Sequence, residues 1–203
     1  MLFQSYIFIL LFFPLCLLGF WGLKRQKLLQ LWLIAFSLWF YGAASPYYLL
    51  LLLGSIAWNY AFFCAIERGI GRVTERVSGN AMERAEYGME RDSSRKRLLL
   101  GIGIAGNLAL LCFFKYFNAI SAGWSQMKGL EDPILQLALP LGISFFTFQQ
   151  IGFLADAYKG EVGACSLREY VLFVSFFPYV SSGPIVNAQE MLPQYRQIGR
   201  QRL

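Results

Sequence analysis

The side chains best suited to chemistry gather in a stretch that is otherwise almost wholly apolar, between residues 139 and 186. Ser144, Thr147 and Gln150 are spaced three residues apart, Gln149 adjoins them, and Asp156 follows at the end of the run. Because residues three apart on a helix drift slowly around one side, these polar side chains can project together. Two interpretations stay open: hydrogen bonds between packed helices, or the polar wall of a substrate passage.

Helix-breaking residues interrupt the last apolar run, where Pro178 is followed by Ser181-Ser182-Gly183-Pro184. Proline removes a backbone donor and glycine loosens the chain, so unpaired carbonyl groups arise that protein or water must satisfy if the run lies in lipid. The sequence therefore predicts a broken or re-entrant helix near Pro178–Pro184. The candidate substrate-channel residues come from the polar stripe and this turn: Ser144, Thr147, Gln149, Gln150, Asp156, Gly183 and Pro184.

The composition indicates why these polar residues matter. Of 203 residues, 57% are hydrophobic and 15% are charged, which is too apolar for a soluble domain of this size. Crossing about 30 Å of hydrocarbon takes roughly 17 to 25 helical residues, and six charge-free runs approach that length. We therefore expect one all-α, polytopic integral membrane domain over residues 1–203, with about six hydrophobic helices: Tyr6–Leu23, Leu28–Ser45, Tyr47–Ile66, Leu98–Phe114, Ile134–Ala155 and Tyr170–Val186.

The first run does not have the features of a signal peptide. Nothing basic precedes it, its apolar part is too long for an h-region, and no small-residue cleavage site follows. We interpret it as a retained span.

The basic residues indicate orientation rather than nucleic-acid binding. The net charge is +6, yet 13 of the 18 Lys and Arg fall on one side of the membrane if the amino terminus is outside. This distribution obeys the positive-inside rule. We therefore expect a membrane protein whose amino terminus is outside, with no nucleic-acid partner.

The polar segments are expected to connect the spans. Residues 67–97 carry eight bases and six acids and predict a cytoplasmic linker: either a short amphipathic helix, broken near Gly79 and followed by a mobile segment, or a solvated linker with snorkelling arginines. Ser45-Pro46 predicts a tight hairpin, residues 118–132 an outer loop, and residues 187–203 an interfacial tail. Asp156, at a span end, is expected to pair with Lys159 or Arg168.

Two apparent site motifs have simpler explanations. Gly101-Ile102-Gly103-Ile104-Ala105-Gly106 matches a dinucleotide fingerprint, but no strand precedes it, so the small residues predict close packing between membrane helices. Asn107, on the same helix, needs a hydrogen-bond partner, which we expect on another helix. The four cysteines have no metal-ligand spacing, and no metal site or catalytic residue is predicted.

Several motifs, taken in order, resemble the bacterial branch of the membrane-bound O-acyltransferase (MBOAT) family, and most of all its alginate-acetylating members. The similarity runs through nearly the whole chain but covers less than half of a family member, its amino-terminal portion. The motifs are Met1-Leu2-Phe3-Gln4-Ser5-Tyr6, Phe114-Lys115-Tyr116, Leu139-Pro140-Leu141-Gly142-Ile143-Ser144-Phe145, Asp156-Ala157-Tyr158-Lys159-Gly160, Phe177-Pro178 and Ser182-Gly183-Pro184-Ile185.

The resemblance implies acyl transfer from a cytoplasmic donor, acetyl-CoA or another acyl carrier, through a channel to a hydroxyl of an exported polysaccharide. It implies a location in the bacterial cytoplasmic (inner) membrane and no covalently bound cofactor. The expected partners are the lipid bilayer, the polysaccharide acceptor and periplasmic or extracellular acyltransferase subunits. The family relies on a histidine as base, and this chain has none. We expect that the sequence stops before that histidine and that these 203 residues alone are inactive. Asn187-Ala188 also departs from relatives that carry basic or histidine residues there.

Two alternatives remain open. Within the family, the activity could be transfer of D-alanine to teichoic acid. Outside it, the chain could be a non-catalytic membrane scaffold or a transporter fragment. A transporter should show paired broken helices in matching halves and a carboxylate at mid-depth, whereas the acids here gather at span ends.

Overall fold

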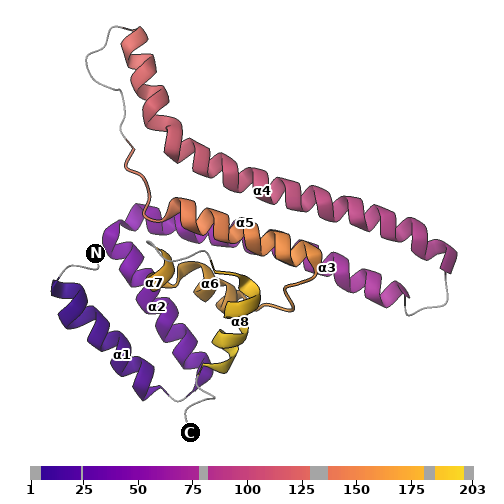
Figure 1. The fold of residues 1–203 in the computed structure, drawn as a ribbon, viewed down its shortest axis with the longest axis horizontal. Coiled ribbons are helices and arrows are strands. Elements are labelled where there is room, and N and C mark those ends of the chain that lie inside the picture. The colour runs from indigo at the N-terminus through magenta and orange to yellow at the C-terminus, as the bar shows by residue number, and fades with distance from the viewer. Residues whose placement is uncertain (1–5, 24, 78–81, 129–136, 181–185, 199–203) are drawn as a thin grey trace.

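The computed structural model describes residues 6–23, 25–77, 82–128, 137–180 and 186–198, and every regular element within them is helical. This confirms the all-α prediction. Figure 1 shows α3 and α5 side by side with α4 running along them, α1 and α2 on the opposite side, and α6 to α8 packed between. The elements are η1 (Phe8–Phe12, a π-helical turn), α1 (Phe13–Gly22), α2 (Gln26–Ala44), α3 (Pro46–Val77), α4 (Met82–Met127), α5 (Ile143–Lys159), α6 (Leu167–Ser175), α7 (Phe177–Val180) and α8 (Ala188–Gln197).

The hairpin between α2 and α3 has the predicted form. Ser45 is extended (φ −163°, ψ 118°) and its N–H donates to the Tyr41 carbonyl, which closes α2. Pro46 then begins α3, a position where proline is tolerated because the first helical N–H has no partner in any case. The turn is therefore a single residue, as the proline predicted.

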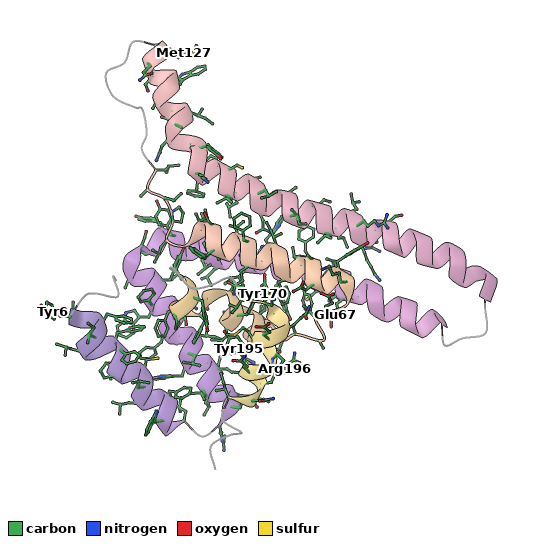
Figure 2. All side chains as sticks on the ribbon, viewed as in Figure 1. Tyr6, Glu67, Met127, Tyr170, Tyr195 and Arg196 are labelled. Atoms are coloured by element: carbon green, nitrogen blue, oxygen red, sulfur yellow. The ribbon has the colours of Figure 1, made fainter. Side chains whose placement is uncertain are left out.

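The polar segment after α3 is more helical than expected. Residues 67–77 continue α3, and residues 82–97 form the start of α4. The helix expected before Gly79 is therefore present, but as part of α3 and not as a separate short helix, and the segment expected to follow it is helical over residues 82–97. The break near Gly79 lies outside the described residues. The predicted outer loop was wrong over residues 118–127, which extend α4 to Met127. At 1.5 Å per residue, α4 is about 69 Å long, and Met127 lies well away from the bundle (Figure 2).

The fifth apolar run is only partly helical, because α5 begins at Ile143 rather than near residue 134. Gly142 precedes it in the left-handed region (φ 67°), a conformation that glycine adopts without steric cost. Residues 137–140, which the structure describes as non-helical, come before this turn. Pro140 and Gly142 thus lie in the entry to the helix, before its first turn.

Side chains from three other helices satisfy the backbone of this non-helical entry. The Tyr41 hydroxyl donates to the Leu141 carbonyl at 2.8 Å, and the Tyr48 hydroxyl donates to the Ala138 carbonyl. The Asn118 amide exchanges two hydrogen bonds with Leu137, at 2.7 and 2.8 Å. Non-helical backbone at membrane depth is stable only when protein or water pairs its polar groups in this way.

Aromatic rings form the core that these helices share. Phe12 from η1 lies edge-on to Phe177 from α7, with ring centroids 5.3 Å apart. Phe153 from α5 contacts Phe63 from α3 at 5.1 Å and Tyr170 from α6 at 4.6 Å. Such pairs contribute about 0.5–1.5 kcal/mol each beyond their burial. The short helices α6 and α7 are therefore held inside the bundle by ring contacts on two sides.

The outer surface of the bundle is apolar. Two described segments, Pro46–Arg68 and Ser94–Met127, are long and apolar enough to cross a membrane by length and composition, and Phe8–Gly22 is a shorter apolar helix. Leu10, Leu98 and Ile120 are each more than 60% exposed. Large apolar side chains exposed along several helices are expected where a surface faces lipid or another protein. These segments fit a membrane protein, although α5 and α6 are shorter than the runs that predicted them.

Candidate functional site

A buried hydrogen-bond chain joins α3, α5 and α6 through Gln150. The Gln150 amide donates to the Ser55 hydroxyl at 2.9 Å, and the Tyr170 hydroxyl donates to the Gln150 carbonyl oxygen at 3.1 Å. Gln150 and Tyr170 are fully buried. Both ends of the Gln150 side chain are thus paired with other helices, which is the arrangement that a polar group in an apolar interior requires.

A second polar pair joins α3 to α4. Asn59 and Asn107 exchange amide hydrogen bonds at 3.0 and 2.6 Å. Each amide also donates to a carbonyl four residues earlier on its own helix, Ser55 at 2.9 Å and Gly103 at 2.8 Å. The prediction that Asn107 finds its partner on another helix is confirmed.

The break between α6 and α7 is repaired by side chains from two other helices. Phe176 leaves the helical region (φ −54°, ψ 109°). The Gln149 amide donates to the Phe173 carbonyl at 3.1 Å, and the Phe177 N–H donates to the Ser37 hydroxyl at 3.3 Å. In an unbroken helix Phe177 and Phe173 would bond to each other. Gln149 and Ser37 therefore replace both halves of the lost bond. The helix breaks at Phe176, two residues before the predicted region Pro178–Pro184, whose residues 181–184 lie outside the described part of the chain.

The remaining residues of the predicted stripe differ in their surroundings. Thr147 is fully buried, and its hydroxyl has no hydrogen-bond partner among the described residues. Ser144 is half-buried near the start of α5. Gly183 and Pro184 lie outside the described residues. The stripe is thus one face of α5 on which Gln149 and Gln150 bond to neighbouring helices and Thr147 keeps an unused hydroxyl.

Asp156, near the end of α5, is half-buried and differs from its expected role. Among the described residues, no Lys or Arg nitrogen lies within 4.0 Å of its carboxylate, and Lys159 instead pairs with Glu161 at 3.9 Å. Burial raises the pKa of Asp156, the nearby charge of Glu161 raises it further, and Lys159 opposes both. The predicted ion pair with Lys159 or Arg168 was therefore wrong, because the α5 end directs Lys159 toward the following turn.

An ionic clasp holds α8 against the start of α6. Arg196 Nε donates to Glu169 at 2.9 Å, and Glu169 also forms a capping box with Ser166. Burial alone would raise the pKa of Glu169, but the hydrogen bonds from Arg196 and Ser166 outweigh it and the pKa is lowered. On α2, Gln26 donates to the Arg196 carbonyl and Gln30 to the Tyr195 carbonyl. After the break, the chain thus returns to the end of the bundle where α6 begins (Figure 2).

The glycines of the apparent dinucleotide motif lie on a packing face. A Cβ at Gly103 would stand 2.9 Å from Leu154, and a Cβ at Gly106 would stand 3.0 Å from the Trp58 ring, whereas Gly101 faces open space. The close-packing prediction is confirmed for two of the three glycines. Among the described residues no group of His, Cys, Asp or Glu could hold a metal ion.

Sequence reasoning missed the two side-chain partners of the stripe, Ser55 and Tyr170, and two further buried polar residues, Ser37 and Asn59. Ser55 and Asn59 lie four residues apart in an apolar run, so they share a helix face and the rule applied to α5 would have found them. Ser37 gave no such signal, because one serine in a membrane helix is common at helix contacts.

Known bacterial O-acetyltransferases are similar to this chain over nearly its whole length. A peptidoglycan O-acetyltransferase of Helicobacter pylori is 34% identical over 232 aligned residues, covering 100% of this chain and 40% of the relative. A probable alginate O-acetylase of Pseudomonas putida is 31% identical over 201 residues, covering 96% and 37%. A teichoic acid D-alanyltransferase of Lacticaseibacillus rhamnosus is 31% identical over 58 residues, or 29% of this chain. No family model and no solved structure matches.

The helical fold with its apolar surface is that of a membrane protein. The matches confirm the resemblance seen in the motifs, because O-acetyltransferases at 31–34% identity cover nearly the whole chain, consistent with an MBOAT-like family. The chain spans about 40% of the length of the curated relatives it matches.

Proposed function

We propose that the protein acts in a membrane-bound O-acyltransferase that transfers acetyl groups to hydroxyls of an exported cell-surface polysaccharide. The observation that carries this proposal is chain-wide similarity to O-acetyltransferases with two different acceptors, peptidoglycan and alginate. Both relatives are named for acetyl transfer, but their acceptors differ. The similarity therefore supports the acetyl-transfer reaction more strongly than it supports peptidoglycan or alginate as the acceptor. The donor is an acyl carrier such as acetyl-CoA, and periplasmic or extracellular subunits would assist transfer.

In this proposal the chain crosses the cytoplasmic membrane about six times with its amino terminus outside. The segment from α6 through α7 to α8 is re-entrant, which the clasp between Arg196 and Glu169 supports, since α8 returns to the end where α6 starts. This arrangement keeps Arg196 on the same side as most other basic residues.

The polar face of α5 is proposed as part of the substrate passage. Thr147 supports this role, because a buried hydroxyl without a partner is rare and needs an explanation, and here it is free to bond a passing substrate. Ser144, Asp156, Gly183 and Pro184 would line the same passage toward its ends. Gln149 and Gln150 would hold its wall in place through Phe173, Ser55 and Tyr170.

Acetyl transfer to a hydroxyl needs a base to remove the proton, and the sequence holds no histidine. The described part of the chain buries no carboxylate beside the Gln150 network. Its residues are therefore proposed to bind, orient and enclose substrates. We expect the 203-residue chain alone, in membranes with acetyl donor and polysaccharide, to form no acetylated product.

Deletion of the gene in its host tests the proposal. The expected result is loss of alkali-labile acetate from one isolated polymer, either peptidoglycan or an exopolysaccharide, and restoration by the gene on a plasmid. Unchanged acetate in both polymers would contradict it. The shorter similarity to a D-alanyltransferase makes D-alanine the second candidate group, and release of D-alanine in place of acetate would select it.

A further inference from the structure

A groove of about 380 Å³ opens between α3 and α4 on the outside of the bundle. Gly54 opens it, because no atom lies within 4 Å of a Cβ placed there, whereas the Trp58 ring packs 3.0 Å from a Cβ placed on Gly106 and forms one wall. Gly54 and Trp58 are exposed, so the groove opens outward. The residues that line it are Leu51, Gly54, Ser55, Trp58, Gly106, Asn107 and Leu110.

The polar residues at the floor of the groove are already bonded within the protein. Both hydrogens of the Asn107 amide are donated, to Asn59 and to the Gly103 carbonyl, and its oxygen accepts from Asn59. The Ser55 hydroxyl accepts from Gln150, and the Ser55 carbonyl accepts from Asn59. These groups therefore favour an occupant that needs no hydrogen bonds from the floor.

The depth of the groove narrows the choice of occupant. It runs from Leu51 to Trp58 on α3, and Ala57 lies halfway along the segment Pro46–Arg68, 11 residues from each end. At 1.5 Å per residue, the groove lies within about 9 Å of that midpoint. Lipid headgroups lie roughly 15 Å or more from the centre of a bilayer. Only the hydrocarbon part of a lipid reaches this depth.

We propose that this groove holds one acyl chain of a bilayer phospholipid, bound between α3 and α4 and separate from the polar face of α5. The chain would fill the space beside Gly54 and would stabilise contact between the two helices. The inference depends on the groove and the membrane location, and it does not depend on the acceptor or the donor of the proposed reaction.

Photocrosslinking in vesicles tests the site with the whole 203-residue chain. The probe is a phosphatidylcholine that carries a diazirine midway along one acyl chain, and labelled residues are mapped by mass spectrometry. We expect labelling of Trp58 and Leu110 at least fivefold above Leu50 and Leu108, exposed neighbours on the same helices. Gly54→Phe, which places a ring in the groove, should reduce this ratio to about one. Gly101→Phe is the matched control, because its side chain would enter open space on α4, and it should leave the ratio unchanged.

Three results would overturn the proposal. The first is equal labelling of the groove residues (Trp58 and Leu110) and of Leu50 and Leu108 in the unmodified chain, which would mean that no lipid is held in the groove. The second is a raised labelling ratio that excess long-chain acyl thioester abolishes but excess phospholipid does not. This result would mean that the groove binds an acyl donor. The third uses Leu51→Trp, which fills the groove from its other end. If the labelling ratio falls with Gly54→Phe but not with Leu51→Trp, the labelling does not come from an acyl chain bound in the groove. Labelling of Leu50 and Leu108 reports that each variant is inserted.

Discussion

The Gln149 amide donates to the Phe173 carbonyl across the contact between α5 and α6, at the point where the helix that contains Phe173 breaks. Ser37 from α2 accepts from Phe177 on the other side of the same break. A polar residue in the predicted stripe and a serine more than a hundred residues earlier therefore stabilise one irregular turn. The break is specifically stabilised, because both backbone groups of the lost bond between Phe177 and Phe173 have a side-chain partner.

Gln149→Leu should destabilise the protein by leaving the buried Phe173 carbonyl unpaired. The expected loss is about 1–3 kcal/mol, the usual penalty for one unsatisfied buried group. The measurement is the free energy of unfolding in bicelles, titrated with a denaturing detergent and followed by circular dichroism. Gln189→Leu, on the exposed side of α8, is the matched control and should change stability by less than about 0.5 kcal/mol. If Gln149→Leu and Gln189→Leu lower the free energy of unfolding equally, the hydrogen bond to Phe173 does not contribute more to stability than a surface hydrogen bond.

The amide pair of Asn59 and Asn107 should behave as a coupled unit. Asn59→Leu or Asn107→Leu alone leaves the other amide without its interhelical partner, and each should destabilise the protein. The double substitution should cost less than the sum of the two. Interhelical hydrogen bonds in membranes contribute about 0.6 kcal/mol on average and up to about 1.7, so the coupling energy should fall in that range. Additive effects in a double-mutant cycle would show that the two amides act independently.

Sequence reasoning predicted the polar face of α5 because glutamines in an apolar run need partners, and Gln149 and Gln150 have them. It did not predict Tyr170 as a partner, because tyrosine near a span end is common at membrane interfaces. The linker over residues 67–97 was misjudged for a different reason. Its Ala, Glu, Arg and Met residues are strong helix formers, and its charge pattern masked that propensity.

Gly19 should tolerate no side chain. A Cβ at this position would stand 2.1 Å from the Trp32 indole, and the Trp32 N–H is fixed by a hydrogen bond to the Cys16 carbonyl at 3.3 Å. Gly19→Ala must therefore displace α1 from α2, with a loss of about 1–3 kcal/mol by overpacking. Gly101→Ala, in open space on α4, is the control and should not destabilise. If the two variants unfold at the same denaturant concentration, the close approach of Gly19 to Trp32 is not energetically important.

The two acids at one end of the bundle should give pH dependences of opposite sign. The pKa of Glu169 is lowered from its ordinary value of 4.5, since Arg196 and Ser166 outweigh burial. Its contribution to stability is therefore complete above about pH 4.5 and is lost as the pH falls through the lowered value. Burial and Glu161 raise the pKa of Asp156 above 3.8, so its ionisation opposes folding as the pH rises through the raised value.

At neutral pH, Glu169→Gln should therefore destabilise the protein and Asp156→Asn should stabilise it. Unfolding free energies of the unmodified chain and both variants, measured between pH 3 and pH 7, separate the two contributions because each variant removes one titration. The difference between the unmodified chain and Glu169→Gln should shrink toward acid pH, where the clasp with Arg196 is lost in both. A difference that stays constant from pH 7 to pH 3 would show that Glu169 stabilises α6 and α8 without its charge.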